Sequence, residues 1–149
     1  MKAEHVPQHC DAGSVDEHSN QEPLLNRFSE VAYLLLRLGV AFLFIFHAPQ
    51  KWLGWFGGPA FPLTSIRSLA SLIELVASPL IAVGWFTSYA ALLAAAEMAG
   101  AYYMVHWPRP GWPIENRGEL AVLYFFVFVY MVARGGGKYS LDRVLRGTP

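Results

Sequence analysis

The chain has 149 residues, with 11 Lys and Arg, 11 Asp and Glu, a formal net charge of zero, 54% hydrophobic residues and 15% charged residues. This length fits one domain. Soluble domains carry about 25% charged residues, so the composition favours a membrane protein over a soluble globule. The zero net charge and the lack of a Lys/Arg block argue against nucleic-acid binding. A single cysteine, Cys10, excludes an internal disulfide.

Residues 1–26 are polar and mixed in charge, which predicts a disordered tail. Apolar segments and loops alternate after this tail, and the segment 49–64 is dense in Gly and Pro. We expect helices at about 28–48, 65–85, 88–107 and 117–134. A bilayer core needs roughly 17 to 25 helical residues, which the fourth segment barely reaches. A soluble bundle is the alternative, but it needs a polar stripe on every helix, and ELAVLYFFVFVYMVA has none. The sequence therefore predicts an all-α, integral membrane four-helix bundle.

Four spans would place both termini on one side of the membrane. The basic residues near the spans are more frequent on that side, which predicts cytoplasmic termini. They are Lys2, Arg27, Arg134, Lys138, Arg143 and Arg146, against Lys51, Arg67, Arg109 and Arg117 in the opposite loops. Trp52, Trp55, Trp107 and Trp112 then fall at the outer interface and Trp85 near the inner one.

Each predicted helix carries an ionisable residue. Arg37, Glu74 and Glu97 fall near mid-membrane, and Glu119 opens the fourth helix at its outer end. Such residues are costly in lipid unless they face the bundle interior, and their default interpretation is functional. Arg37 either neutralises one glutamate as a structural pair, or the surplus carboxyls hold protons and hydrogen-bond a carbonyl ligand.

A second cluster of polar residues is expected at the outer face. It contains His47, Lys51, His106, Asn116 and Glu119. If the first helix continues, His47 and Lys51 share one face and suit the head group of a quinone or another polar-headed lipid. The alternative is that Lys51 only extends to the membrane surface. No Glu-x-x-His pair follows Glu74 or Glu97, so we expect no metal site.

Small residues in AALLAAAEMAGA, around Glu97, predict close helix packing. This packing lies either within the chain or in a homo-oligomer, and the pattern does not separate the two.

Several segments together resemble the DoxX family of small bacterial membrane proteins. They are RLGVAFLFIFHAPQKWLGWFGG, SLIELVASPLIAVGW, ENRGELAVLYFF and GGKYSLDRVL, and Ala48 and Pro49 depart from the glycine that usually follows the histidine. The resemblance implies a four-helix domain over residues 27–146, in the bacterial inner (plasma) membrane. Members of the family are often described as oxidoreductases, because they are similar to the small membrane subunit of a thiosulfate:quinone oxidoreductase. The resemblance therefore implies a redox role for this chain.

These patterns lead to a first hypothesis, a membrane subunit of a redox system linked to thiol, sulfur or oxidative-stress metabolism. It would bind a quinone beside His47, Lys51 and Glu119, use Arg37, Glu74 and Glu97 for protons, and meet soluble redox partner proteins. An alternative is a non-catalytic scaffold or assembly factor that docks soluble partners through its tail and the SLDRVL end. A small solute or proton carrier is a third alternative, but no inverted repeat supports it.

Overall fold

The computed structural model describes residues 15–146, and this part of the chain is all-helical, without a β-strand. The helices are α1 (Val15–Ile45), α2 (His47–Leu53), α3 (Ile66–Val83), α4 (Thr87–Ala101), α5 (Glu119–Arg134) and α6 (Leu141–Arg146). A π-helical turn, Tyr102–His106, continues α4, and a 3-10 turn, Trp55–Gly57, follows α2. Helices α1, α3, α4 and α5 therefore occupy the four segments that the hydropathy pattern predicted.

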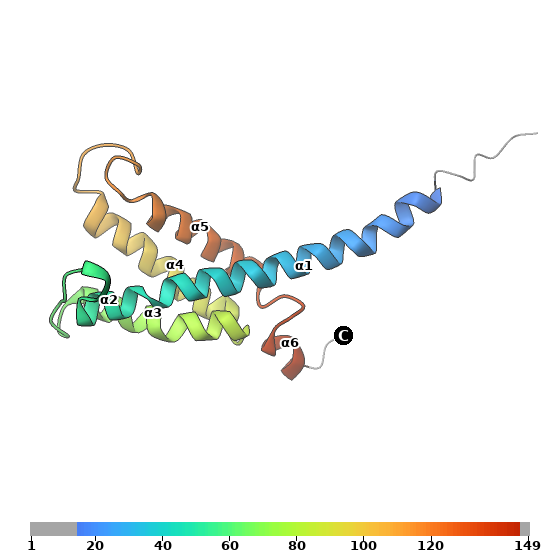
Figure 1. The fold of residues 1–149 in the computed structure, drawn as a ribbon, viewed down its shortest axis with the longest axis horizontal. Coiled ribbons are helices and arrows are strands. Elements are labelled where there is room, and N and C mark those ends of the chain that lie inside the picture. The colour runs from blue at the N-terminus through green and yellow to red at the C-terminus, as the bar shows by residue number, and fades with distance from the viewer. Residues whose placement is uncertain (1–14, 147–149) are drawn as a thin grey trace, which may run out of the picture.

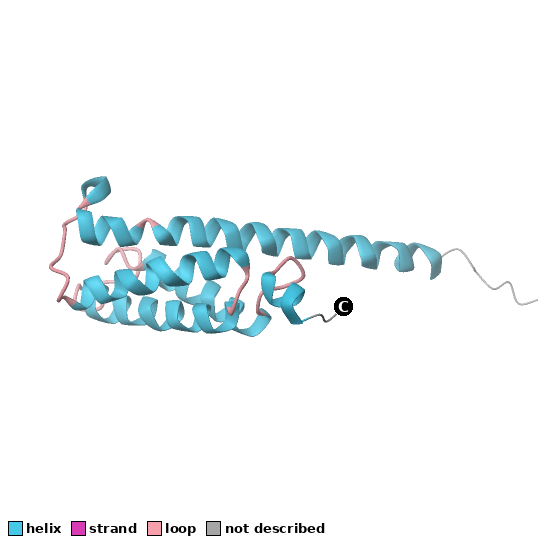
Figure 2. Ribbon diagram, turned by 90° about the horizontal axis from the view of Figure 1, so that it is seen from below, coloured by secondary structure: helices cyan, strands magenta, loops and turns pink. Residues whose placement is uncertain are grey.

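The four long helices lie side by side, with α2 at one end and α6 at the other (Figures 1 and 2). In sequence order, α1 packs on α3, α3 on α4 and α4 on α5. Aromatic rings connect α1 to α5, because the Phe44 ring centroid lies 4.9 Å from that of Phe128 and 5.6 Å from that of Tyr124. Large aromatic side chains therefore fill the contact between α1 and α5.

Two boundaries differ from those expected. Helix α1 begins at Val15, inside the stretch 1–26 predicted as a disordered tail; residues 1–14 lie outside the described residues. At the other end, α1 stops at Ile45, and a separate helix, α2, occupies part of the predicted loop. Pro49 explains this break, since it has no N–H to donate to the carbonyl of Ile45.

Four polar side chains of α3 are buried, whereas many of its apolar side chains face outward. Ser71, Glu74 and Ser78 are buried, whereas Leu72 and Val76 are exposed. A soluble bundle has the opposite pattern. Two helical stretches, Leu24–Leu53 and Ile66–Val83, are long and apolar enough to cross a bilayer; α4 and α5 are shorter, with 15 and 16 residues.

The small residues of α4 pack within the chain. Ala90, Ala91, Ala94 and Ala95 are all buried in the core, together with residues of the neighbouring helices. Alanines let the backbones of α4 and α5 approach closely. Intrachain packing therefore accounts for these alanines.

Candidate functional site: a lysine between two buried glutamates

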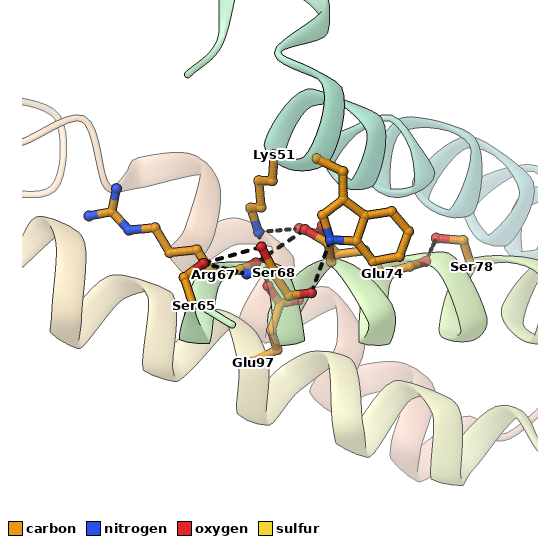
Figure 3. Close-up of polar contacts among 9 residues, drawn as sticks. Lys51, Ser65, Arg67, Ser68, Glu74, Ser78 and Glu97 are labelled. Carbon is orange, nitrogen blue, oxygen red and sulfur yellow. Dashed lines mark hydrogen bonds and ion pairs between the residues drawn. The ribbon is translucent and has the colours of Figure 1, made fainter. Parts of the chain in front are cut away.

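A lysine on α2 reaches into the bundle and contacts a glutamate on each of two other helices (Figure 3). Lys51 Nζ lies 2.6 Å from Glu74 Oε1 on α3 and 3.4 Å from Glu97 Oε1 on α4. The glutamate side chains are only 1% and 4% exposed, and that of Lys51 is 22% exposed. Both second carboxyl oxygens, Glu74 Oε2 and Glu97 Oε2, are buried without a hydrogen-bond partner among the described residues. The cluster therefore has unused hydrogen-bonding capacity.

Local sequence features place α2 over this cluster. The break before Pro49 ends α1, and Gly54, in the left-handed region at φ 68°, ends α2 after two turns. Trp52 then fixes α2 on α3, because its Nε1 donates to the backbone oxygen of Ser68 at 3.2 Å. Lys51, the neighbour of Trp52, is held by this contact above Glu74.

A cavity of about 670 Å³ adjoins the cluster, between α2, α3, α4 and α5. His47, Lys51 and Glu97 line its inner part. The rest of its wall is mostly apolar, and several of the apolar lining side chains are themselves exposed at the surface. These are Ile66, Leu69, Leu93, Met104 and Leu120. The cavity therefore joins a charged inner end to a mouth that is mostly apolar but also carries the exposed Arg67 and Arg117.

The structure brings together only part of the predicted ligand-binding set. His47 and Lys51 share the short helix α2, and both line the cavity together with His106. Asn116 is buried behind His106, with its backbone oxygen 3.1 Å from His106 Nδ1. Glu119 is exposed at the first residue of α5 and does not line the cavity. Of the five residues, three line the cavity, one supports it and one lies outside it.

Arg37 does not lie with the two glutamates, contrary to the expectation of one mid-membrane group. Its side chain is buried at the α6 end, where it donates to the backbone oxygens of Gly136 and Tyr139, the latter at 2.6 Å. Lys51 is instead the cation that meets Glu74 and Glu97. The predicted pairing of Arg37 with a glutamate is therefore wrong, because Arg37 binds backbone oxygens and Lys51 takes the place of the cation.

The lining residues that the sequence analysis did not anticipate include Tyr124 and Arg117. Tyr124 on α5 lines the cavity, with its ring centroid 6.2 Å from that of His47, and Arg117 lines it from the loop before α5. Tyr124 was hidden in the sequence by the aromatic run LYFFVFVY. For Arg117, the only sequence feature that could have indicated a place in the site is its position next to Asn116.

Fold and site together define an all-helical protein that has a charged cluster in its interior. Its outer surface is rich in apolar side chains. Residues 32–107 match the DoxX family model. The chain belongs to the DoxX family, whose members are membrane-associated.

Two relatives from Haemophilus influenzae are similar over most of their length. One, described as an uncharacterized protein, is 37% identical over 125 residues, which cover 79% of this chain and 93% of the relative. A second, with the same description, is 27% identical over 129 residues, which cover 79% of this chain and 85% of the relative. No solved structure matches the chain.

Proposed function

We propose that this protein is a multi-pass membrane subunit of a redox system and that it binds a quinone in the cavity beside Lys51. The observation that carries the proposal is the Lys51–Glu74–Glu97 cluster at the inner end of a cavity whose wall is mostly apolar. Such a site matches a ligand with a polar ring and an apolar tail.

The surface supports the membrane part of the proposal. Large apolar side chains are exposed on all four long helices, for example Phe42 on α1, Leu72 on α3, Leu92 on α4 and Phe126 on α5. An exposed apolar surface of this extent marks an interaction with lipid or with another protein. Exposed tryptophans add a second feature, since aromatic belts occupy the two membrane interfaces. Trp55, Trp107 and Trp112 follow or precede helices at the α2 end, and Trp85 lies in the turn at the α6 end.

The charges of the cluster support the quinone part. Lys51 offers an ammonium donor to a ring carbonyl, and it neutralises only one of the two glutamates beside it. The second carboxyl is neutral when it holds a proton, which is the favourable state in an apolar interior. Reduction of a quinone consumes protons as well as electrons. In this proposal, a soluble redox partner supplies the two electrons that reduce the quinone to the quinol, and Glu74 and Glu97 relay the two protons that the reduction takes up.

Ligand binding by the purified full-length protein tests the proposal. The protein is placed in lipid nanodiscs and titrated with an alkylated 1,4-benzoquinone, and quenching of tryptophan fluorescence is recorded. We expect saturable binding that Lys51→Met weakens about tenfold, since a charge-assisted hydrogen bond contributes about 1.5 to 3 kcal/mol.

Lys138→Met is the matched control, because it removes the same charge from an exposed residue at the other end of the bundle. The Lys138→Met variant should bind the quinone with the same affinity as the unmodified protein. Wild-type protein that shows no saturable binding would refute the quinone site, whatever the variants do.

A further inference from the structure

His106 ends the π-helical turn and faces a backbone carbonyl. Its Nδ1 lies 3.1 Å from the oxygen of Asn116. A carbonyl oxygen only accepts hydrogen bonds, so Nδ1 carries the hydrogen and donates it. In the neutral ring, Nε2 is then a bare acceptor, and the described residues provide it with no hydrogen bond. Since His106 lines the cavity, this nitrogen is the polar atom that the ring offers to a ligand.

Contacts with the surrounding loop and with Tyr102 fix the orientation of the His106 ring. Asn116 Oδ1 accepts from the backbone N–H of Gly118 at 2.9 Å, which holds the loop in shape. Gly118 leaves no room for a side chain, because an added Cβ would lie 2.6 Å from Cε2 of the Tyr102 ring. That ring in turn stacks on His106, with the centroids 6.1 Å apart and the planes 26° apart. A π-helical turn with such supports often marks a functional position.

The polar groups that line the cavity therefore differ in hydrogen-bonding character. Lys51 and a protonated glutamate donate hydrogen bonds, and so does Arg117 in the loop before α5, whereas Nε2 of His106 accepts. Glu97 and His106 are nine residues apart on the continuous helix formed by α4 and the π-helical turn. At about 1.5 Å per residue, their backbones lie roughly 13 Å apart along the helix axis.

From this arrangement, we infer that His106 makes the cavity select a ring bearing a hydroxyl group, the quinol, over the fully oxidised quinone. A quinol donates one hydroxyl hydrogen to His106 Nε2, and its other hydroxyl accepts from Lys51. A quinone has only acceptor oxygens and leaves Nε2 facing a lone pair. The inference rests on the proposed function. It specifies that the quinol is the form bound most tightly and that His106 is the residue that selects it.

Three probes with the same ring and alkyl tail test the selection in nanodiscs under nitrogen: an alkylated hydroquinone, its dimethyl ether and the corresponding quinone. The unmodified protein should bind the hydroquinone about three- to tenfold more tightly than either other probe, which is the effect of one net hydrogen bond. His106→Phe keeps a ring and removes the acceptor, so the preference should disappear. His106→Gln retains an acceptor oxygen and should keep most of it.

The outcomes separate the two proposals. If the unmodified protein binds all three probes equally, or if His106→Phe keeps the preference, the role of His106 is refuted while Lys51-dependent quinone binding stands. If no probe binds saturably, the proposed function fails and this inference fails with it. Should His106→Phe not fold, the comparison of hydroquinone with its dimethyl ether on the unmodified protein, together with His106→Gln, decides the result.

Discussion

Single residues carry the charge balance inside this bundle. Lys51 stands against two buried carboxyls, and its removal leaves both without a cation. The cost of breaking a buried pair in this way is about 3 to 5 kcal/mol, because an uncompensated charge remains in an apolar interior. The same reasoning makes the glutamates interdependent, since protonation or amidation of one relieves the other.

We therefore predict that Lys51→Met lowers the free energy of unfolding by a few kcal/mol and that Lys51→Met combined with Glu97→Gln lowers it by less than the sum of the single changes. Thermal or denaturant unfolding in mild detergent, followed by circular dichroism, measures the coupling. Lys138→Met serves as the control and should leave the transition within experimental error. Strict additivity would show that Lys51 and Glu97 do not interact.

Arg37 acts at the other end of the molecule, where it holds the segment after α5. Because its two hydrogen bonds go to the backbone oxygens of Gly136 and Tyr139, we predict that Arg37→Met releases residues 135–146. Amide hydrogen exchange in this segment should become about tenfold faster, the change expected for a local loss of roughly 1.4 kcal/mol.

Quinone affinity distinguishes this anchoring of residues 135–146 from the hypothesis that Arg37 takes part in proton transfer together with Glu74 and Glu97. Arg37 is not among the residues that line the cavity, so its replacement should change the affinity less than about twofold. Faster exchange near Lys51 rather than at residues 135–146 would contradict the structure.

At the scale of elements, the turn between α3 and α4 depends on one glycine. Gly84 has φ 75°, and an added Cβ would lie 2.9 Å from Cα of Ser140. The segment beyond is fixed by Asp142, whose carboxylate accepts from the backbone N–H groups of Phe86 at 3.0 Å and Thr87 at 3.2 Å. The last loop therefore closes directly over the start of α4.

We predict that Gly84→Ala destabilises the protein by about 1 to 3 kcal/mol, because it strains the backbone and displaces Ser140. Gly39→Ala on α1 is the matched control, since an added Cβ there meets nothing within 4 Å. That change should be neutral or slightly stabilising, as alanine favours a helix interior. Equal unfolding midpoints for the two variants would show that the turn tolerates a side chain.

For the whole molecule, the arrangement of four long helices places residue 138 and the loop 107–118 at opposite ends of the bundle (Figure 1). If the bundle crosses the inner membrane with cytoplasmic termini, these two positions face opposite compartments. Cys10 is the single cysteine of the chain, which makes the orientation accessible to labelling.

We predict that a membrane-impermeant maleimide labels the introduced cysteine of Cys10→Ser/Arg109→Cys in intact bacterial spheroplasts. Cys10 itself, and the introduced cysteine of Cys10→Ser/Lys138→Cys, should react only after the membrane is permeabilised. The reverse pattern would establish the opposite orientation. Labelling of all three positions in intact spheroplasts would contradict a membrane-spanning bundle.

The sequence by itself determined the all-helical fold class, the four long helices and the DoxX resemblance. Hydropathy and turn residues are local signals, so they locate an element from its own residues. They did not reveal α2 as a separate helix or the start of α1 at Val15, although Pro49 marks the first of these boundaries.

Only the tertiary structure decided which charges meet. Glu74, Glu97, Arg37 and Lys51 were all visible as unusual residues, but helices that are apolar on most sides leave their rotation about the helix axis unspecified. Packing sets that rotation, and it joins Lys51 to partners 23 and 46 residues away while it sends Arg37 to a loop 99 residues away. The bare nitrogen of His106 likewise follows from a contact with Asn116, which no local pattern specifies.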